Sequence, residues 1–317
     1  MSEKFCGANC ATPDLEMLSS SRTTPVAAFV FMALGATGLT LGDFFIKLSM
    51  GAGVSFAELL TFAWPLTVVL LVLVAHLNGG IPHHLSARNR WPLLVRTLLL
   101  LVMSWLNITS LSLNPYAQHA MLFQLSPVFA LLIGVALFGE AATKSTLLVL
   151  AMCLIGTWLV LKPDAQGLSF SLLFAVAAAF MNSATNAYIA ANNKAATALG
   201  YTFYAVNGVL LIAGPYWLLF ERKVPSLEAL LWIQLSALFA VSGLVFVGRA
   251  FILAQQNIGQ VSTMLYVQIP IAVVLGWAVF GEAPPPTAIL GSVFIVIAGV
   301  IISRRSTKDA QNLSPKC

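Results

Sequence analysis

Few side chains in this sequence could do chemistry, and the most conspicuous is a guanidinium inside a long apolar stretch. Arg249 lies in the segment 228–254, which is otherwise almost entirely apolar or small. A guanidinium stays charged, so in apolar surroundings it requires a cavity, a carboxylate or an anionic ligand. We expect Arg249 to contact the anion of a ligand. The alternative is a side chain that reaches outward to the polar end of the segment.

Amide and aromatic side chains in the other apolar segments could hydrogen-bond to and stack against the same solute. Asn182 and Asn186 are one helical turn apart and share a face. The predicted solute contacts are the amides Asn107, Gln124, Asn182, Asn186 and Gln268 and the rings of Trp105, Phe123 and Tyr266. Trp105 and Asn107 are two positions apart, so they should face different sides of a helix. The alternatives are amides that only join helices and rings that anchor helices at a membrane surface.

Two titratable side chains could take up or release protons. His119 can change charge near neutral pH, and Asp43 would be a proton or cation site if it faced a cavity. Lys47 follows Asp43 by one turn, so a structural ion pair between the two is the alternative.

Several kinds of catalytic and cofactor site are absent from the sequence. It has no His-Glu-x-x-His zinc motif, no Gly-x-Ser-x-Gly nucleophile turn and no Gly-rich phosphate loop with Lys. Cys6, Cys10, Cys153 and Cys317 do not form a ligand set with His. The net charge of +5 comes from scattered residues rather than a basic stripe, so nucleic acid is not an expected partner. We predict no enzyme activity, no metal and no cofactor.

The composition requires that lipid solvates most of the chain. Of its 317 residues, 59% are hydrophobic and 9% are charged, whereas soluble domains carry roughly 25% charged residues. The sequence therefore predicts an all-α integral membrane protein with about ten transmembrane helices. The expected spans are 26–47, 59–77, 92–113, 116–138, 145–161, 168–191, 200–220, 228–254, 261–280 and 285–303.

The second half of the sequence repeats the first. Met121–Pro127 is echoed 143 positions later by Met264–Pro270, and each copy ends in Phe-Gly-Glu. The predicted repeats are 25–162 and 163–303, with five helices each; because five is odd, the second copy should enter the membrane inverted. Residues with a predicted hinge or helix-capping role are Pro127, Pro270, Gly139, Glu140, Gly281 and Glu282. Each Glu should lie at the start of the following helix, where the dipole favours negative charge.

Both ends of the chain are predicted to be cytosolic tails, disordered over 1–24 and short over 304–317. Placing both termini inside puts ten Lys and Arg residues in the cytosol and four outside, as the positive-inside bias requires. The expected location is the cell inner membrane, with the chain crossing it many times.

The repeated segments resemble a known family. Asn114-Pro-Tyr-Ala with Gln124-Leu-Ser-Pro127 and Phe-Gly-Glu140, and their second-half counterparts ending in Phe-Gly-Glu282, are similar to the two EamA-type repeats of the drug/metabolite transporter superfamily. The likeness extends over roughly 26–303 and includes Gly42-Asp-Phe-Phe-Ile-Lys47. The chain departs from the family at Thr61-Phe-Ala-Trp64, where many members carry an Arg.

This resemblance implies transport of a small organic solute. We expect a secondary transporter that moves an amino-acid, vitamin or nucleoside-like metabolite by alternating access. The alternatives are a channel, or a scaffold or receptor without active transport. The expected partners are the solute and the lipid bilayer, and the protein should be a monomer or a weak homodimer.

Overall fold

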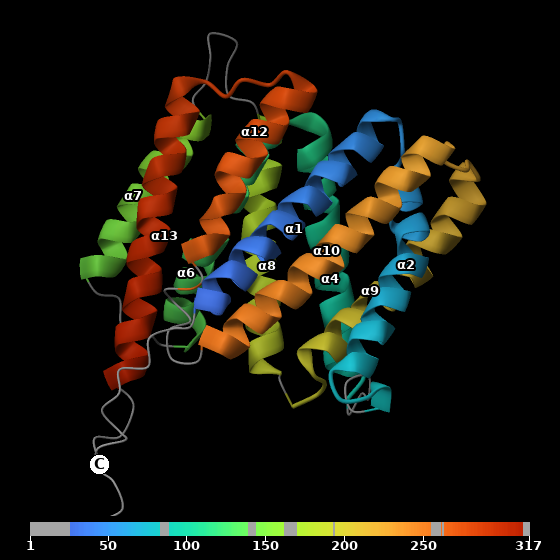
Figure 1. The fold of residues 1–317 in the computed structure, drawn as a ribbon, viewed down its shortest axis with the longest axis horizontal. Helices are drawn as coiled ribbons and strands as arrows, with labels where there is room; N and C mark the ends of the chain where they lie inside the picture. Colours follow the sequence, from blue (N-terminus) through green and yellow to red (C-terminus); the bar gives the residue numbers. More distant parts are fainter. Residues whose placement is uncertain are drawn as a thin grey trace, which may run out of the picture.

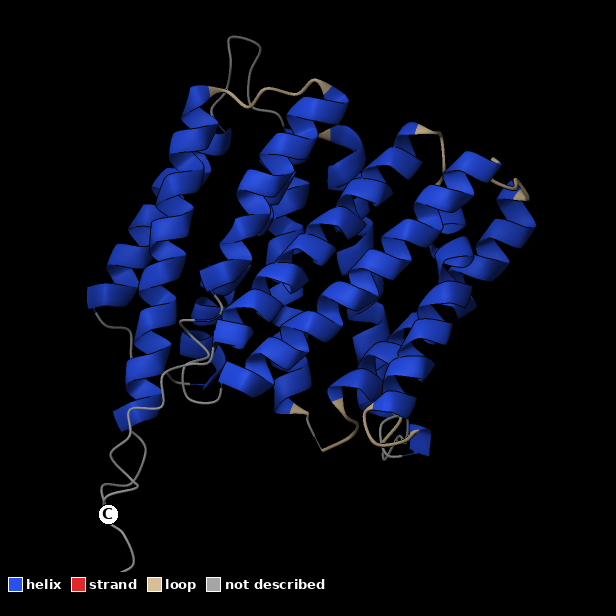
Figure 2. Ribbon diagram, viewed as in Figure 1, coloured by secondary structure: helices blue, strands red, loops and turns tan. Residues whose placement is uncertain are grey.

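The structure is a computed structural model that describes residues 26–82, 89–138, 144–161, 170–192, 194–254, 261 and 263–312. Every regular element within these ranges is helical (Figure 2). Six helices are long and apolar enough to cross a membrane: Val26–Gly51, Phe56–Leu77, Trp91–Leu113, Phe170–Ile189, Leu199–Glu221 and Leu227–Leu253. The chain is thus a helical, multi-pass membrane protein. The predicted tail 1–24 and the residues Gly139 and Glu140 lie outside the described ranges.

The helices follow the predicted order of segments. Their bounds are α1 (Val26–Gly51), α2 (Phe56–Leu77), α4 (Trp91–Leu113), α5 (Tyr116–Phe123), α6 (Ser126–Phe138), α7 (Lys144–Leu161), α8 (Leu173–Ala191), α9 (Ala198–Tyr216), α10 (Leu227–Ala254), α12 (Gln268–Phe280) and α13 (Pro286–Asn312). Short turns precede α8 (Phe170–Leu172) and α12 (Thr263–Val267), and a π-helical turn, Trp217–Glu221, follows α9. The last helix extends past residue 303, the expected end of the second repeat. That the remaining helices also cross the membrane stays a prediction.

The expected span 116–138 is interrupted between α5 and α6, directly before Pro127. Because Pro127 has no N–H, the carbonyl of Phe123 loses its helical donor. Ser126 Oγ donates to that carbonyl instead, at 3.0 Å. Pro270, the matching residue, lies in the first turn of α12, where a missing N–H removes no helical hydrogen bond. Both prolines therefore coincide with irregular backbone whose polar groups require another partner inside a membrane.

The helices are arranged around a central group in which α1 and α10 lie side by side (Figure 1). Helix α4 packs on α8, while α7 and α13 form one edge of the molecule and α2 and α9 the other. Within the central group, α1 and α10 approach at their glycines: a Cβ on Gly38 would lie 2.9 Å from Gly243 Cα. The small-residue spacing Gly38-x-x-x-Gly42 thus serves packing inside this chain.

The joint after α12 confirms one predicted helix cap and corrects another. Gly281 has φ +66°, and its N–H and that of Glu282 close the helix on the carbonyls of Trp277 and Gly276. The left-handed glycine end predicted for Gly281 is therefore confirmed. Glu282, however, does not begin the next helix, because α13 starts at Pro286. Its carboxylate lies at the N-terminus of α5 instead, where it accepts the N–H of Tyr116 at 2.6 Å.

Candidate functional site

Helix α4 separates two regions that could bind a solute, because its two faces carry different chemistry. One face holds Leu101, Val102 and Trp105 and lines a cavity of about 520 Å³ between α2, α4 and α9. The opposite face carries Arg96, Asn107 and Ser110, which are buried among the other helices. Trp105 and Asn107 thus point to different sides, as their spacing predicts, and cannot both contact one small ligand.

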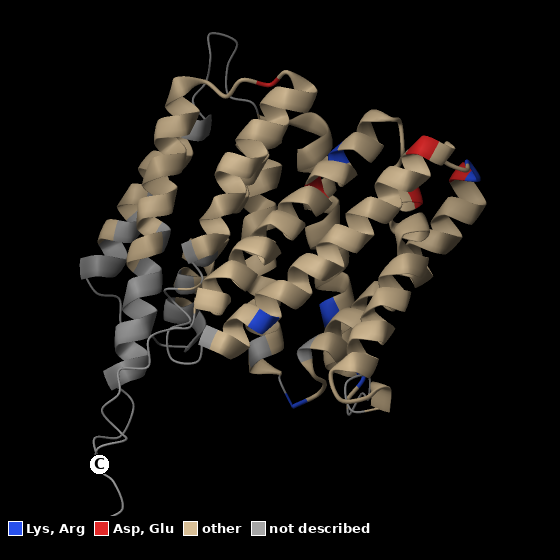
Figure 3. Cartoon of the chain, in the orientation of Figure 1, with Lys and Arg blue, Asp and Glu red and all other residues tan. Residues whose placement is uncertain are grey.

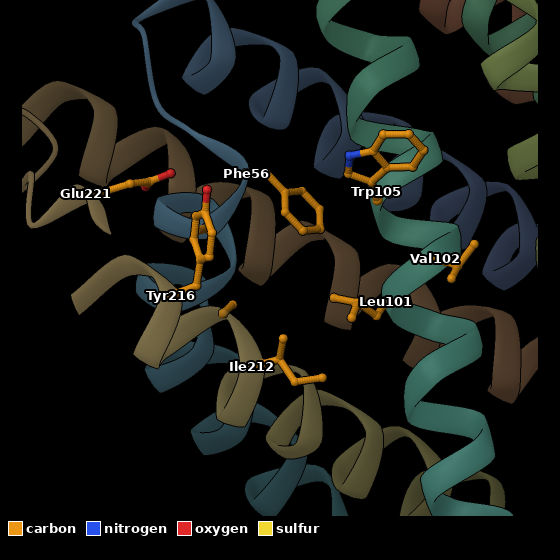
Figure 4. Close-up of a pocket in the computed structure, with 9 residues that line it drawn as sticks. Phe56, Leu101, Val102, Trp105, Ile212, Tyr216 and Glu221 are labelled. Atoms are coloured by element: carbon orange, nitrogen blue, oxygen red, sulfur yellow. The ribbon is translucent and has the colours of Figure 1, made fainter. Parts of the chain in front are cut away.

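The cavity beside Trp105 is mainly apolar with one acidic group. Phe56, Trp105, Ile212 and Tyr216 project toward a common space from three helices (Figure 4). Glu221, at the end of the π-helical turn, also lines this cavity, and its carboxylate accepts a hydrogen bond from Ser55 Oγ. Such a cavity suits the ring of an amphipathic solute, because aromatic walls favour stacking and the carboxylate favours a donor or a cation.

The inward face of α4 meets α1 at an acidic side chain. Asn107 Nδ2 donates to Asp43 Oδ1 at 3.4 Å. Asn107 is only 7% exposed, and its Oδ1 has no hydrogen-bond partner among the described residues. A buried carbonyl oxygen without a partner favours a bound water or a ligand donor at this point.

His119 lies one helix farther on and presents a second unpartnered atom. Its Nδ1 is 2.9 Å from Ser110 Oγ, and its ring stacks on Phe123 with centroids 5.9 Å apart. His119 is 1% exposed, and within the described structure its Nε2 has no partner. The faces of α1, α4 and α5 therefore bring together four predicted site residues, Asp43, Asn107, His119 and Phe123. We call these four residues with Ser110 the interior polar cluster.

The polar contacts continue to the end of α1, where Lys47 forms an ion pair. Lys47 Nζ lies 2.9 Å from Glu282 Oε1 and donates to the carbonyl of Asn114 at 2.5 Å. The same ammonium lies 5.1 Å from the centre of the Phe280 ring. Lys47 thus pairs with Glu282 rather than with Asp43, the partner suggested by their one-turn spacing. The Lys47–Glu282 pair joins the first half of the chain to the second.

Asn114 strengthens the same junction. Its Nδ2 donates to the carbonyl of Ser171 at 2.9 Å, and its Oδ1 accepts from Ser171 Oγ at 2.6 Å. Asn114 also bonds back to Ser110, which contacts His119. The end of α4 is therefore linked both to the interior polar cluster and to the start of α8.

The remaining predicted amides do not converge on this cluster. Gln124 Nε2 donates to the carbonyl of Leu265 at 3.0 Å, which joins the break after α5 to the turn before α12. Asn182 donates to Ser126 Oγ at 3.3 Å, whereas Asn186 is exposed. Tyr266 is buried in the apolar core beside Met121 and Leu122, and Gln268 is half-buried. Gln124 and Asn182 are placed as contacts between helices, the alternative expected for such amides.

Of Arg96 in α4 and Arg249 in α10, the structure buries Arg96, to which the sequence assigns no role. Arg249 is exposed, and its Nη2 donates to Asn78 Oδ1 at 3.2 Å. This placement fits the outward-reaching alternative. Arg96 is 8% exposed and lies on the inward face of α4. The signal that could have found it is its spacing of 11 residues from Asn107, which places both on one helical face.

Comparisons with known proteins point to transporters. The chain is 28% identical to the pseudopaline exporter of Pseudomonas aeruginosa over 60% of its length and 66% of the exporter's. It is 24% identical to the riboflavin transporter of Vibrio cholerae over 62% of its length and 65% of that transporter's. A probable terminal-alkyne amino-acid exporter of Streptantibioticus cattleyicolor is 24% identical over 61% of the chain and 65% of the exporter. The matched regions span just under two thirds of these relatives.

A solved crystal structure shares the fold at 17% identity, with a TM-score of 0.58, over 90% of this chain and 99% of its own. No family model matches the chain. All three relatives described above are named as transporters or exporters.

Proposed function

We propose that this chain is a secondary transporter of a small organic metabolite, of the EamA type within the drug/metabolite transporter superfamily. Two inverted halves of five helices each would alternate between openings to the two sides of the cell inner membrane. Both termini would lie in the cytoplasm, and the working unit would be a monomer or weak homodimer. The relatives named for pseudopaline, riboflavin and an amino acid support a small organic solute.

One hydrogen bond carries the proposal of two related halves. Trp64 Nε1 donates to Asn207 Oδ1 at 3.2 Å, and the two residues are 143 positions apart. That separation is the offset of the sequence repeat, so these positions are equivalent. Equivalent positions of two copies can touch only beside the axis that relates the copies. The contact therefore supports an axis that passes between α2 and α9.

The pairing of the other helices supports the same axis. The repeat offset relates α1 to α8 and α4 to α10, and the structure packs α1 on α10 and α4 on α8. Each contact is the counterpart of the other under an exchange of halves.

The directions of the helices also agree with inverted halves. Lys47 near the end of α1 contacts Asn114 after the end of α4, and Asn114 contacts Ser171 before α8. Helices α1 and α8 therefore run in opposite directions.

The interior polar cluster is the proposed solute region. Asn107 Oδ1 and His119 Nε2 supply one acceptor and one ring nitrogen without partners in the described structure. Phe123 covers one face of the His119 ring. In this proposal Asp43 and His119 also couple protons. Uptake into proteoliposomes that an imposed pH gradient leaves unchanged would remove that coupling role.

The contacts of Lys47 are proposed to close one end of this region. Lys47 and Glu282 come from different halves, and their pairing ties α1 and α5 to the joint between α12 and α13. Alternating access requires the halves to separate at each end in turn. The Lys47–Glu282 pair would therefore break when this end opens.

The decisive experiment is counterflow in proteoliposomes. A thermal-shift screen of metabolites on the purified protein first selects a solute that raises its Tm. Vesicles preloaded with that solute should then take up a labelled trace of it transiently against its gradient, with saturable kinetics. Flux that never saturates would favour the channel. A solute that binds but never crosses would favour the scaffold or receptor.

A further inference from the structure

Arg96 is a buried cation that has neither a hydrogen-bond partner nor an ion-pair partner among the described residues. Its side chain is 8% exposed, inside the membrane-crossing helix α4. Both Nε and Nη1 are buried and have no hydrogen-bond partner among the described residues. Burying a charge without compensation costs several kcal/mol, and polar groups that persist within a membrane are usually functional. This arrangement indicates a binding site in which an anion compensates the charge of Arg96.

The acidic side chains that the structure describes are placed elsewhere. In Figure 3 the segments coloured for Asp and Glu lie toward one end of the helices, the upper end of the view. These residues are Asp43, Glu58, Glu221, Glu228 and Glu282. None of these five residues forms an ion pair with Arg96. Glu282 forms its ion pair with Lys47. The charge of Arg96 is thus not neutralised by a carboxylate of the described residues.

Arg96 lies near the other end of α4 from these acids. Leu93, one turn before it, packs on Ala195 and Tyr201 at the junction of α8 and α9. Thr97, the next residue, meets Gly208 of α9 so closely that an added Cβ would lie 2.6 Å from Thr97 Cγ2. Helix α9 therefore occupies the side of α4 next to Arg96. The Nε and Nη1 atoms of the Arg96 guanidinium are themselves buried.

The same face of α4 leads from Arg96 to the interior polar cluster. Asn107 is 11 residues farther on, which is about 16 Å along a helix and about 20° around its axis. Ser110 continues the stripe and contacts His119. A solute that moves along this face would meet a cation at one end and hydrogen-bonding groups toward the other.

We propose that Arg96 binds the carboxylate of the transported solute, an inference that rests on the function proposed above. A single guanidinium matches the single negative charge of a carboxylate, and charge-assisted hydrogen bonds to it are strong. A phosphate monoester carries about −1.5 to −2 and would leave surplus charge in the bundle. The solute is therefore a small organic acid or a zwitterion with a free carboxylate.

The test compares carboxylates with their carboxamides on variants of the full-length protein in detergent. Suitable probe pairs are benzoate with benzamide and indole-3-acetate with indole-3-acetamide, each at millimolar concentration. Arg96→Gln removes the charge, and Arg96→Lys retains it without the planar guanidinium. Arg90→Gln is the matched control, because Arg90 precedes the same helix and is exposed. The readout is the rise in Tm on adding each compound.

At least one carboxylate should raise the Tm of the unmodified protein while its carboxamide does not. Arg96→Gln should abolish that rise, Arg96→Lys should keep part of it, and Arg90→Gln should keep all of it. Equal stabilisation by acid and amide, an unchanged response in Arg96→Gln, or no response to any carboxylate would overturn the site. Failure of the proposed function has a different signature: a carboxylate that binds through Arg96 but shows no counterflow.

Discussion

The unpartnered donors of Arg96 carry a free-energy cost in the ligand-free protein, and a shorter, uncharged side chain would avoid it. Arg96→Met should therefore raise the Tm of the ligand-free protein while it removes binding of carboxylates. Arg90→Met should leave Tm nearly unchanged, because Arg90 is exposed. Differential scanning fluorimetry in detergent provides the comparison. A lower Tm for Arg96→Met would show that the guanidinium stabilises the empty protein through its surroundings.

Trp105 and Asn107 contribute to separate regions, so their effects on solute affinity should be independent. Each Ala substitution that weakens binding should do so by about 0.5–1.5 kcal/mol, the range for an aromatic contact or a hydrogen bond. Because the side chains face opposite sides of α4, the double variant should equal the sum within about 0.5 kcal/mol. Isothermal titration calorimetry of the screened solute against the unmodified protein, the two single variants and the double variant gives the coupling energy. A larger coupling energy would place both side chains on one ligand.

At the scale of residues, the sequence predicts which side chains share a helix face. It does not predict whether Arg96 or Arg249 is the buried arginine. The spacing of Trp105 and Asn107 alone predicts their divergence. For Arg96 and Arg249, position along an apolar segment does not fix whether the long side chain turns inward or reaches a surface. That outcome depends on neighbours from distant segments: α9 beside Thr97 in one case and Asn78 in the other.

Among elements, the contact between α1 and α10 should tolerate no added volume. A Cβ on Gly243 would lie 2.7 Å from the backbone nitrogen of Leu39. Gly243→Ala should therefore lower stability by about 1–3 kcal/mol through overpacking, and Tm should fall accordingly. Gly248→Ala is the control on the same helix, because an added Cβ there meets nothing within 4 Å. Equal Tm values for the two variants would contradict this packing.

The effects of Lys47 and Glu282 on stability should be coupled. Glu282→Ala removes the ion pair and the acceptor at the start of α5. Lys47→Met removes the ion pair and the hydrogen bond to the carbonyl of Asn114. Each variant should lower the free energy of unfolding by about 1.5–3 kcal/mol, the range for a hydrogen bond to a charged group, and Tm should fall accordingly. The double variant should lower it by less than the sum of the two single effects, since the pair cannot be lost twice. A sum of the two single effects would mean that Lys47 and Glu282 act separately.

The elements themselves were predictable where the signal is local. Gly281 ends α12 because of its own backbone freedom, and the prolines mark interruptions because they lack an N–H. The role of Glu282 was not predictable from local pattern. The helix terminus that it caps begins 166 residues earlier in the chain, and only folding brings Tyr116 to it.

At the scale of the molecule, inversion predicts that equivalent loops face opposite compartments. Ala52 follows α1 and Lys194 follows α8, and both are exposed. With Cys6, Cys10, Cys153 and Cys317 replaced, Ala52→Cys should react with an impermeant maleimide from outside. Lys194→Cys should react only after the membrane is permeabilised. Ala283→Cys, beside Glu282, should behave like Ala52→Cys. Labelling of all three from one side would exclude inverted halves.

The proposed duplication rests, in the sequence, on identical residues in the fourth and ninth expected spans. Elsewhere the two copies share little more than the order of their apolar blocks. The contact of Trp64 with Asn207 could not be foreseen, since different residue types occupy these equivalent positions. A repeat offset gives correspondence between positions, whereas the place of the axis depends on which helices come to lie together.

The link between Lys47 and Glu282 also bears on how the protein is made. Translation delivers Lys47 to the bilayer long before Glu282 has been synthesised, and the first turn of α5 must wait equally long for its carboxylate. A nascent chain ending after the first half would hold an ammonium without its counter-charge and a helix without its acceptor. The Lys47–Glu282 joint can therefore form only after α12 and Glu282 have been synthesised.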